Sequence, residues 1–414
     1  MKQVKGLFGY CLIFGSLSFT IITTLFNIQY QEESSIYILY NLSIAMIGYL
    51  YFVNKVFFHK QSIIFWDIVC ILGMIVSFIV SKYLFNNDSK MAFDFWTYMI
   101  IWAIPAYLYG VSIANQKKYD ILWKTVDIFM IAITIVVCKN AIYYYLNGRS
   151  AFSVSGTTTY QTMSYLAALA MGINYYLIVE KSDELRPKLL RKSKVYKIFC
   201  FIMLALQAGA LFISGGRGGM ILAVTYFMVI TCFFNKNTNK KVKYVVMVFS
   251  VIMMIFFLTS DNAQITEGLN RIFEFVGQDG GINWEGTSGR DEIYIKAFDL
   301  IKAKPIFGYG IWSIFRHIRN PHNMILELLL GGGIVLLFIV IGLFTYVFKK
   351  YISIIREDKN NRLFFIFFLY NFIMLMFSGT YLCAPTLWFF IGYVLNYKFL
   401  DKKKNIGKRY SISI

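Results

Sequence analysis

Three short segments combine residue types that can bind an anion or transfer a proton. The first is Ser214–Gly219, in which four glycines surround Arg217. Glycines let a backbone turn tightly and approach a ligand closely, and the arginine guanidinium offers a permanent bidentate partner to a phosphate. Arg217, with Gly216 and Gly218 beside it, is therefore a candidate anion-binding site. The alternative is a close-packed helical hairpin in which Arg217 only reaches lipid headgroups.

The second segment is Thr287–Asp291, in which Ser288 and Asp291 have the spacing of a helix-capping box. Arg290 would then lie in the first turn of a helix, close to backbone N–H groups that attract anions. The alternative is that Arg290 pairs with a neighbouring acidic residue on a solvated surface, where such pairs contribute little.

The third segment begins at His322 and continues through Asn323 to Glu327 and three consecutive glycines, 331–333. Histidine takes or gives a proton near neutral pH, and asparagine can orient a hydroxyl or carbonyl group. Glu327 lies one turn further into an apolar stretch, where an ionisable group is costly and usually functional. The alternative is that His322 caps the helix while the glycines allow close helix packing.

The composition indicates which elements must position these residues. Hydrophobic residues make up 58% of the 414 residues and charged residues only 15%, with a mean hydropathy of +0.58. A soluble domain needs about a quarter charged residues. We expect residues 1–414 to form a single all-α, polytopic integral membrane domain, because helices satisfy their own backbone groups in lipid. About twelve apolar stretches approach the ~20 residues of a transmembrane helix: 7–26, 36–54, 63–81, 92–113, 123–146, 160–179, 195–213, 218–234, 243–259, 323–347, 363–379 and 384–399.

The net charge of +19 has a topological explanation and does not call for a nucleic-acid partner. With the N-terminus placed in the cytoplasm, the cytoplasmic segments contain 29 lysines and arginines, against 4 in the short outer segments. Positive residues mark the cytoplasmic side of short loops, so both termini are predicted to be cytoplasmic. The six cysteines fall within predicted spans without a C-x-x-C pair, which implies neither a disulfide framework nor a metal site.

One outer segment, residues 260–321 between the ninth and tenth spans, is much longer than the others. Loops of this length in compact proteins usually have a function or a structure of their own. Ser260 and Ser288 can each begin a helix, and Pro305 ends the second one. That second helix has apolar residues at helical spacing: Ile293, Ala297 and Ile301. We expect a large, partly helical extracytoplasmic loop that lies over the bundle.

The order of the three segments resembles a known family. A glycine-flanked Arg217 is followed by Ser288–Glu292, which leads into Pro305–Gly310, and then by His322-Asn323 with a glycine cluster about nine residues on. This order, over roughly residues 155–345, resembles the O-antigen ligase and Wzy-type polysaccharide polymerase superfamily of bacteria.

The resemblance implies a GT-C-like membrane glycosyltransferase that uses polyprenyl-diphosphate-linked oligosaccharides without a metal or other cofactor. It implies diphosphate binding for Arg217 and Arg290 and a general-base role for His322. A glycosyl diphosphate is already activated, so the enzyme must position the acceptor, stabilise the departing charge and manage one proton. Glu327 is assigned from residue chemistry alone, as an orienter of His322 or as an alternative base.

The resemblance favours a polysaccharide polymerase that joins undecaprenyl-diphosphate-linked repeat units on the outer face of the bacterial cytoplasmic membrane. Its product would be a capsule, O-antigen or exopolysaccharide, and its partners membrane lipid, a chain-length regulator and a flippase. The first alternative is an O-antigen ligase, which transfers glycan to a different acceptor. The second is a lipid-linked-oligosaccharide flippase, for which polar residues at mid-membrane and related halves would be expected.

Overall fold

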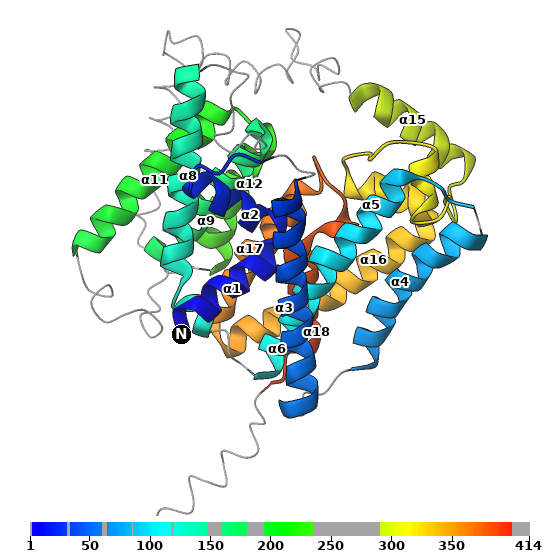
Figure 1. Cartoon of the computed structure of the whole chain (residues 1–414), viewed down its shortest axis with the longest axis horizontal. Helices are drawn as coiled ribbons and strands as arrows, with labels where there is room; N and C mark the ends of the chain where they lie inside the picture. The colour runs from blue at the N-terminus through cyan, green and yellow to red at the C-terminus, as the bar shows by residue number, and fades with distance from the viewer. Residues whose placement is uncertain are drawn as a thin grey trace, which may run out of the picture.

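The structure is a computed structural model of the whole chain, and it describes residues 2–30, 34–59, 64–84, 86–116, 120–147, 159–179, 194–234 and 290–399. These residues form helices joined by turns, and none of them lies in a β-strand. The all-α fold class is therefore confirmed for the described residues. Figure 1 shows the helices as one bundle, with α15 at its margin.

The helices run along the chain in the following order: α1 (Lys2–Phe14), α2 (Ser16–Leu25), α3 (Ser35–His59), α4 (Phe65–Leu84), α5 (Lys90–Tyr98), the π-helical turn η1 (Met99–Ala103), α6 (Ile104–Gln116), α7 (Asp120–Trp123), α8 (Val126–Asn147), α9 (Tyr160–Val179), α11 (Lys194–Ser214), α12 (Arg217–Val229), the π-helical turn η2 (Ile230–Phe234), α15 (Arg290–Ala303), the 3-10 turn η4 (Ser313–Arg316), α16 (Met324–Glu357), η5 (Lys359–Asn361), α17 (Arg362–Met374), η6 (Tyr381–Cys383) and α18 (Pro385–Asn396).

Seven helical stretches of the described chain are long and apolar enough to cross a membrane: Ser35–Phe58, Asp67–Leu84, Lys90–Ala114, Val126–Asn147, Tyr160–Val179, Lys194–Ser214 and Met324–Glu357. The bent pair α1 and α2 would make an eighth. The predicted number of twelve is not confirmed, because α17 and α18 have only 13 and 12 residues. The predicted span 243–259 lies outside the described residues, and the GT-C-like arrangement stays a prediction.

The first predicted span, 7–26, differs from a single helix. It consists of α1 and α2, which meet at an angle of 120°. Gly15 between them has a φ of 53°, a left-handed conformation that ends α1 and that glycine adopts without steric cost. Gly15 also lies against Trp102 and Pro385, where a side chain would be crowded. The bend therefore depends on Gly15, a single glycine inside a stretch whose hydropathy predicts one continuous helix.

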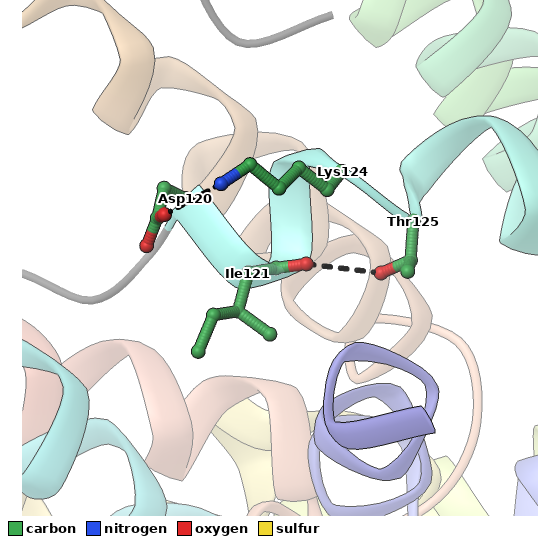
Figure 2. Close-up of polar contacts among 4 residues, drawn as sticks. All are labelled: Asp120, Ile121, Lys124 and Thr125. Atoms are coloured by element: carbon green, nitrogen blue, oxygen red, sulfur yellow. Dashed lines mark hydrogen bonds and ion pairs between the residues drawn. The ribbon is translucent and has the colours of Figure 1, made fainter. Parts of the chain in front are cut away.

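Segments predicted to be cytoplasmic contact one another at one end of the bundle. The Tyr10 hydroxyl of α1 donates to the Leu122 carbonyl of α7 over 2.7 Å, and the Trp123 indole N–H donates to the Asn360 carbonyl over 3.0 Å. Figure 2 shows the α7 turn itself, where Lys124 pairs with Asp120 at 3.0 Å and the Thr125 hydroxyl donates to the Ile121 carbonyl. The α7 turn thus joins α1 to the connection between α16 and α17.

The segments predicted to lie outside meet at another place. Asn87, between α4 and α5, donates to the Trp312 carbonyl over 3.0 Å, and Ser89 donates to the Phe315 carbonyl over 3.1 Å. The Met324 N–H at the start of α16 donates to the Leu375 carbonyl after α17 over 2.8 Å. The predicted alternation of loops therefore agrees with their contacts, while the side that faces the cytoplasm stays a prediction.

Close backbone contact between α6 and α18 fixes the framework of this second group of segments. A Cβ atom added to Gly110 would lie 2.4 Å from the Phe389 carbonyl oxygen, and one added to Gly392 would lie 2.5 Å from that of Tyr107. Small residues let membrane helices approach in this way. Because α18 follows η6 directly, the α6 contact also holds the turn that precedes it in place.

Candidate functional site

The start of α16 is fixed by Asn323. Its side-chain oxygen accepts hydrogen bonds from the N–H groups of Ile325 (3.0 Å) and Leu326 (3.1 Å), which is the N-cap arrangement. Its side-chain nitrogen donates to the Met376 carbonyl over 3.1 Å. Asn323, not His322, therefore caps the helix. Both ends of the Asn323 amide are engaged within the protein, so its part in the site is to hold α16 against the turn that follows α17.

His322 lies immediately before that cap in an uncommon backbone conformation. Its φ is 53°, which residues with side chains adopt infrequently. The His322 N–H donates to the Asn320 side-chain oxygen over 2.8 Å, and the Asn320 side-chain nitrogen donates to the Gly379 carbonyl over 2.9 Å. The imidazole is partly exposed. The loop thus holds His322 in a fixed backbone geometry at the end of the bundle.

Glu327 is buried one turn into α16, with 1% of its surface exposed. The Thr380 hydroxyl donates a short hydrogen bond to Oε1 of its carboxylate, and Oε2 has no hydrogen-bond partner among the described residues. No lysine or arginine in the described ranges forms an ion pair with it. A buried carboxyl group without a cation is costly for folding, and the functional role predicted for Glu327 stays a prediction.

The connection between α17 and η6, residues 375–380, is the part of this site that the sequence did not indicate. Its carbonyl groups accept hydrogen bonds from Met324, Asn323 and Asn320, and Thr380 binds Glu327. The connection contains no charged residue and was predicted to be the end of one span and a short turn. The available signal was Ser378-Gly379, a turn-forming pair between two apolar stretches.

Tyr381 adds a second polar group next to Glu327. Burial raises the pKa of the Tyr381 hydroxyl well above its ordinary value, and the nearby Glu327 carboxylate raises it further. The phenol therefore stays protonated at any physiological pH and keeps a proton to donate. The Thr380 hydroxyl and the Tyr381 backbone are thus the groups of η6 and its N-cap that contact the Glu327 carboxyl, with the Tyr381 hydroxyl in its electrostatic neighbourhood.

The glycine cluster of α16 forms a gap that receives the loop. Gly332 and Gly333 have non-helical backbone angles, and the φ of Gly333 is 61°. Around this break the N–H groups of Tyr309 and Gly310 donate to the Leu330 and Gly331 carbonyls over 2.7 and 2.8 Å. The alternative interpretation, that the glycines allow close helix packing, is therefore incorrect in detail. They admit a backbone segment, and Pro305–Gly310 and 331–333 form one unit.

The glycines beside Arg217 pack against α9. Gly216 is the N-cap of α12, and its carbonyl accepts a 2.8 Å hydrogen bond from the Ser164 hydroxyl. A Cβ atom on Gly218 would lie 1.9 Å from the Tyr165 hydroxyl oxygen. Gly216 and Gly218 therefore allow α12 to pack closely on α9, which is a different contact from the α11–α12 hairpin of the alternative interpretation. The backbone of Arg217 begins α12, as an anion site would need, and its side chain lies outside the described residues.

Arg290 is the first described residue of α15, a helix that ends at Ala303, just before Pro305. The predicted apolar face is confirmed: Ala297 is fully buried, and Ile293 and Ile301 pack against the core. The side chain of Arg290 and the predicted loop helix near Ser260 lie outside the described residues. Within the described ranges, no three His, Cys, Asp or Glu side chains form a group that could hold a metal ion.

The first and third predicted segments lie at the same end of α17. The Tyr226 hydroxyl of α12 donates to the Ile366 carbonyl near the start of α17, so the start of α12 is directed toward the end of α17. At that end, Tyr165 touches the position of Gly218 and its ring lies 6.4 Å from that of Tyr370. Arg290, of the second segment, begins α15, so it is separated from Ala303, at the end next to Pro305, by the length of that helix, about 20 Å.

Comparison with known proteins gives one match. Residues 200–341 match the sequence model of the family described as O-antigen ligase. The matched region contains all three segments and the predicted outer loop, and it confirms the resemblance drawn from their order. No curated protein and no solved structure matches the chain.

Proposed function

We propose that this chain, whose residues 200–341 match the O-antigen ligase family, is a polysaccharide polymerase of the bacterial cytoplasmic membrane. It would join undecaprenyl-diphosphate-linked oligosaccharide repeat units on the outer face, for a capsule, O-antigen or exopolysaccharide. The observation that carries the proposal is the pair His322 and Glu327 at the start of α16, one in a constrained loop and the other buried without a cation.

The proposed reaction forms one glycosidic bond and breaks one glycosyl–phosphate bond. The acceptor hydroxyl oxygen attacks the anomeric carbon of the donor, and the diphosphate leaves with the electron pair of the broken bond. The proton of the acceptor hydroxyl passes to His322. Arg217 and Arg290 bind the diphosphate and stabilise the charge that develops on it. Atoms and charge balance without an additional reactant, because the glycosyl diphosphate is already activated.

The geometry around Glu327 supports two roles for that carboxylate. Thr380 occupies Oε1, which leaves Oε2 to accept a hydrogen bond or a proton. In the first role Oε2 orients His322 and stabilises its protonated form, as carboxylates do for catalytic histidines. In the second role Oε2 is itself the base. The Thr380 hydroxyl supports both roles, because it fixes the plane of the carboxyl group.

An O-antigen ligase is the second candidate, and the description of the matching family favours it. A ligase and a polymerase share a lipid-diphosphate donor and differ in the acceptor. The acceptor of a polymerase is another lipid-linked repeat unit, whereas that of a ligase is a different lipid or protein.

The decisive experiment incubates the purified protein in phospholipid vesicles with a lipid-linked repeat unit, and separates the products on a gel. A ladder of increasing chain length is expected. If the repeat unit stays unchanged until a second acceptor is added, the protein is a ligase. If it stays unchanged with both acceptors but crosses the bilayer, the protein is a flippase and the proposed reaction is wrong.

A further inference from the structure

α16 is longer than a membrane requires. Its 34 residues measure about 51 Å, whereas the hydrocarbon core is about 30 Å thick. The break at Gly332 and Gly333 leaves residues 334–357, which at 1.5 Å per residue still measure about 36 Å. The part of it without charged residues, 334–348, measures about 22 Å and ends before Lys349, so the core must also include the last residues before the break. The boundary of the hydrocarbon core at this end therefore lies close to the break, where Pro305–Gly310 is docked.

The docked segment presents large apolar side chains at this level. Ile306 is 54% exposed and Phe307 is 75% exposed. The Val335 N–H donates to the Ile306 carbonyl over 3.3 Å, so both residues adjoin the first turn of the spanning part of α16. The first two turns of this part of α16 also have exposed apolar side chains, at Ile334 and Phe338. The lipid-facing surface of α16 thus continues onto the loop without an intervening charged residue on α16.

The exposed face of α15 divides into two flanks. With Ala297 buried, rotation by about 100° per residue places Ile295 and Phe298 on one flank together with Lys302. Ile295 is 64% exposed and Phe298 is 52% exposed. The opposite flank carries exposed charged residues: Glu292, Lys296 and Asp299. α15 thus has a side buried against the protein, an exposed apolar side and an exposed charged side. This pattern is typical of a helix that lies at a membrane interface.

We propose that residues 292–307 are embedded in the lipid leaflet at this end of the bundle. Phe298 of α15 and Phe307 of the docked segment would contact phospholipid acyl chains. Lys302 pairs with Asp299 at 3.7 Å, and the Lys304 Nζ lies 4.6 Å from the centre of the Tyr309 ring. Both lysines are exposed and would lie at the level of the headgroup phosphates, as lysines do beside apolar surface. The loop that was predicted to be extracytoplasmic is thus partly a membrane element. The proposal depends on the described contacts and exposures and is independent of the enzymatic activity.

Photochemical crosslinking from single phenylalanine positions tests this proposal on the full chain. Phe298 and Phe307 are each replaced by p-benzoylphenylalanine, which is similar in shape and reacts with nearby C–H bonds on irradiation. The purified variants are irradiated in vesicles of phosphatidylethanolamine and phosphatidylglycerol that contain a headgroup-labelled phosphatidylglycerol. We expect labelled lipid on both variants, at a level equal to that of a Phe338→p-benzoylphenylalanine variant, whose side chain is 64% exposed on α16.

Two further positions provide the controls. Phe364, which is fully buried, and Lys296, on the charged flank of α15, should give no lipid adduct when they carry the same group. If Phe338 is labelled and Phe298 and Phe307 are not, the segment lies in water and the proposal is overturned. A crosslink from Phe307 to another part of this chain, detected by mass spectrometry, also overturns it, because the chain itself then covers the apolar side chains. Gel filtration of each variant shows that it is folded.

Discussion

The Thr380 hydroxyl donates to Glu327, the one carboxylate among the described residues that is deeply buried and keeps an oxygen without a hydrogen-bond partner. Sequence reasoning found Glu327 because an acidic residue in an apolar stretch is conspicuous. It missed Thr380, 53 residues away, because a threonine between two spans is ordinary and the pairing depends on how α17 and α16 meet. Residue types can be predicted to be important from the sequence, whereas their partners across the bundle cannot.

Removal of the Thr380 hydroxyl should impair catalysis even when the replacement side chain has the same shape as threonine. Thr380→Val loses a hydrogen bond to a carboxylate worth about 1.5 kcal/mol, so polymerisation should slow about tenfold. Thr380→Ser keeps the hydroxyl and should retain most of the activity. The measurement is the initial rate of repeat-unit incorporation across a range of pH, because a freed carboxyl should also displace the pH profile. Equal rates and equal profiles for the two variants would show that Thr380 has no positioning role.

Substitutions of His322 and Glu327 should separate their roles. His322→Ala removes the proposed base and should reduce the rate by about a hundredfold or more. If Glu327 orients His322, Glu327→Gln should be less severe, and in the His322→Ala background it should have little further effect. If Glu327 is the base, the order of severity is reversed. Glu292→Gln, at an exposed glutamate of α15, is the control and should leave the rate unchanged.

Loss of either arginine should abolish chain growth without loss of protein from the membrane. Arg217→Ala and Arg290→Ala each remove a group proposed to stabilise the departing diphosphate, and a single such donor is worth about a hundredfold or more. Complementation of a polymerase-null strain measures the effect. Arg319→Ala, an exposed arginine of the same loop, should complement fully. If two of the three variants Arg217→Ala, Arg290→Ala and His322→Ala complement fully, the assigned roles are wrong.

At the scale of the elements, the capping signals predicted helix ends well and helix breaks poorly. The helix beginning near Arg290 and ending before Pro305 was predicted from its cap and its proline, both of which act locally. The break in α16 and the bend at Gly15 were not predicted. A glycine in an apolar stretch is compatible with helix packing, a kink or a docked loop. The choice depends on what approaches it in space.

The docking of the loop into α16 should depend on Gly333. A Cβ atom on Gly333 would lie 2.2 Å from the Ile306 carbonyl oxygen, and the φ of Gly333 is 61°. Gly333→Ala should therefore destabilise the protein by about 1–3 kcal/mol. Gly342→Ala, in the same helix with nothing within 4 Å, should be neutral or stabilising. Thermal unfolding in detergent compares the two, and a Gly333→Ala protein as stable as the Gly342→Ala protein would contradict the docked arrangement.

At the scale of the whole molecule, the composition and charge predicted the class and the alternation of loops. They did not predict the number of crossings, because hydropathy counts apolar stretches and does not distinguish a full span from a helix of 12 or 13 residues inside the bundle. Hydropathy also does not show what an apolar helix faces: α9 is long enough to span, yet 89% of its apolar window is buried within the protein.

The predicted orientation can be tested with two exposed turn residues. Asp88, between α4 and α5, belongs to the end predicted to be outside, and Lys359, between α16 and α17, to the end predicted to be cytoplasmic. Asp88→Cys should react with a membrane-impermeant maleimide in intact cells, because positive residues retain the opposite loops in the cytoplasm. Lys359→Cys should react only after permeabilisation. The opposite pattern would invert the topology, and the parent chain measures labelling of the native cysteines.

The docked segment also constrains how the protein is made. Pro305–Gly310 leaves the ribosome before the glycines of α16. The N–H groups that bind the carbonyls at the break are therefore synthesised before those carbonyls. Until the two meet, the Leu330 and Gly331 carbonyls lack the N–H groups that they bind in the folded protein, which is costly within a bilayer. With the predicted topology, in which this loop is extracytoplasmic, we expect the break in α16 to close only after the loop has been translocated. Insertion of the tenth predicted span would then be coupled to translocation of the segment before it.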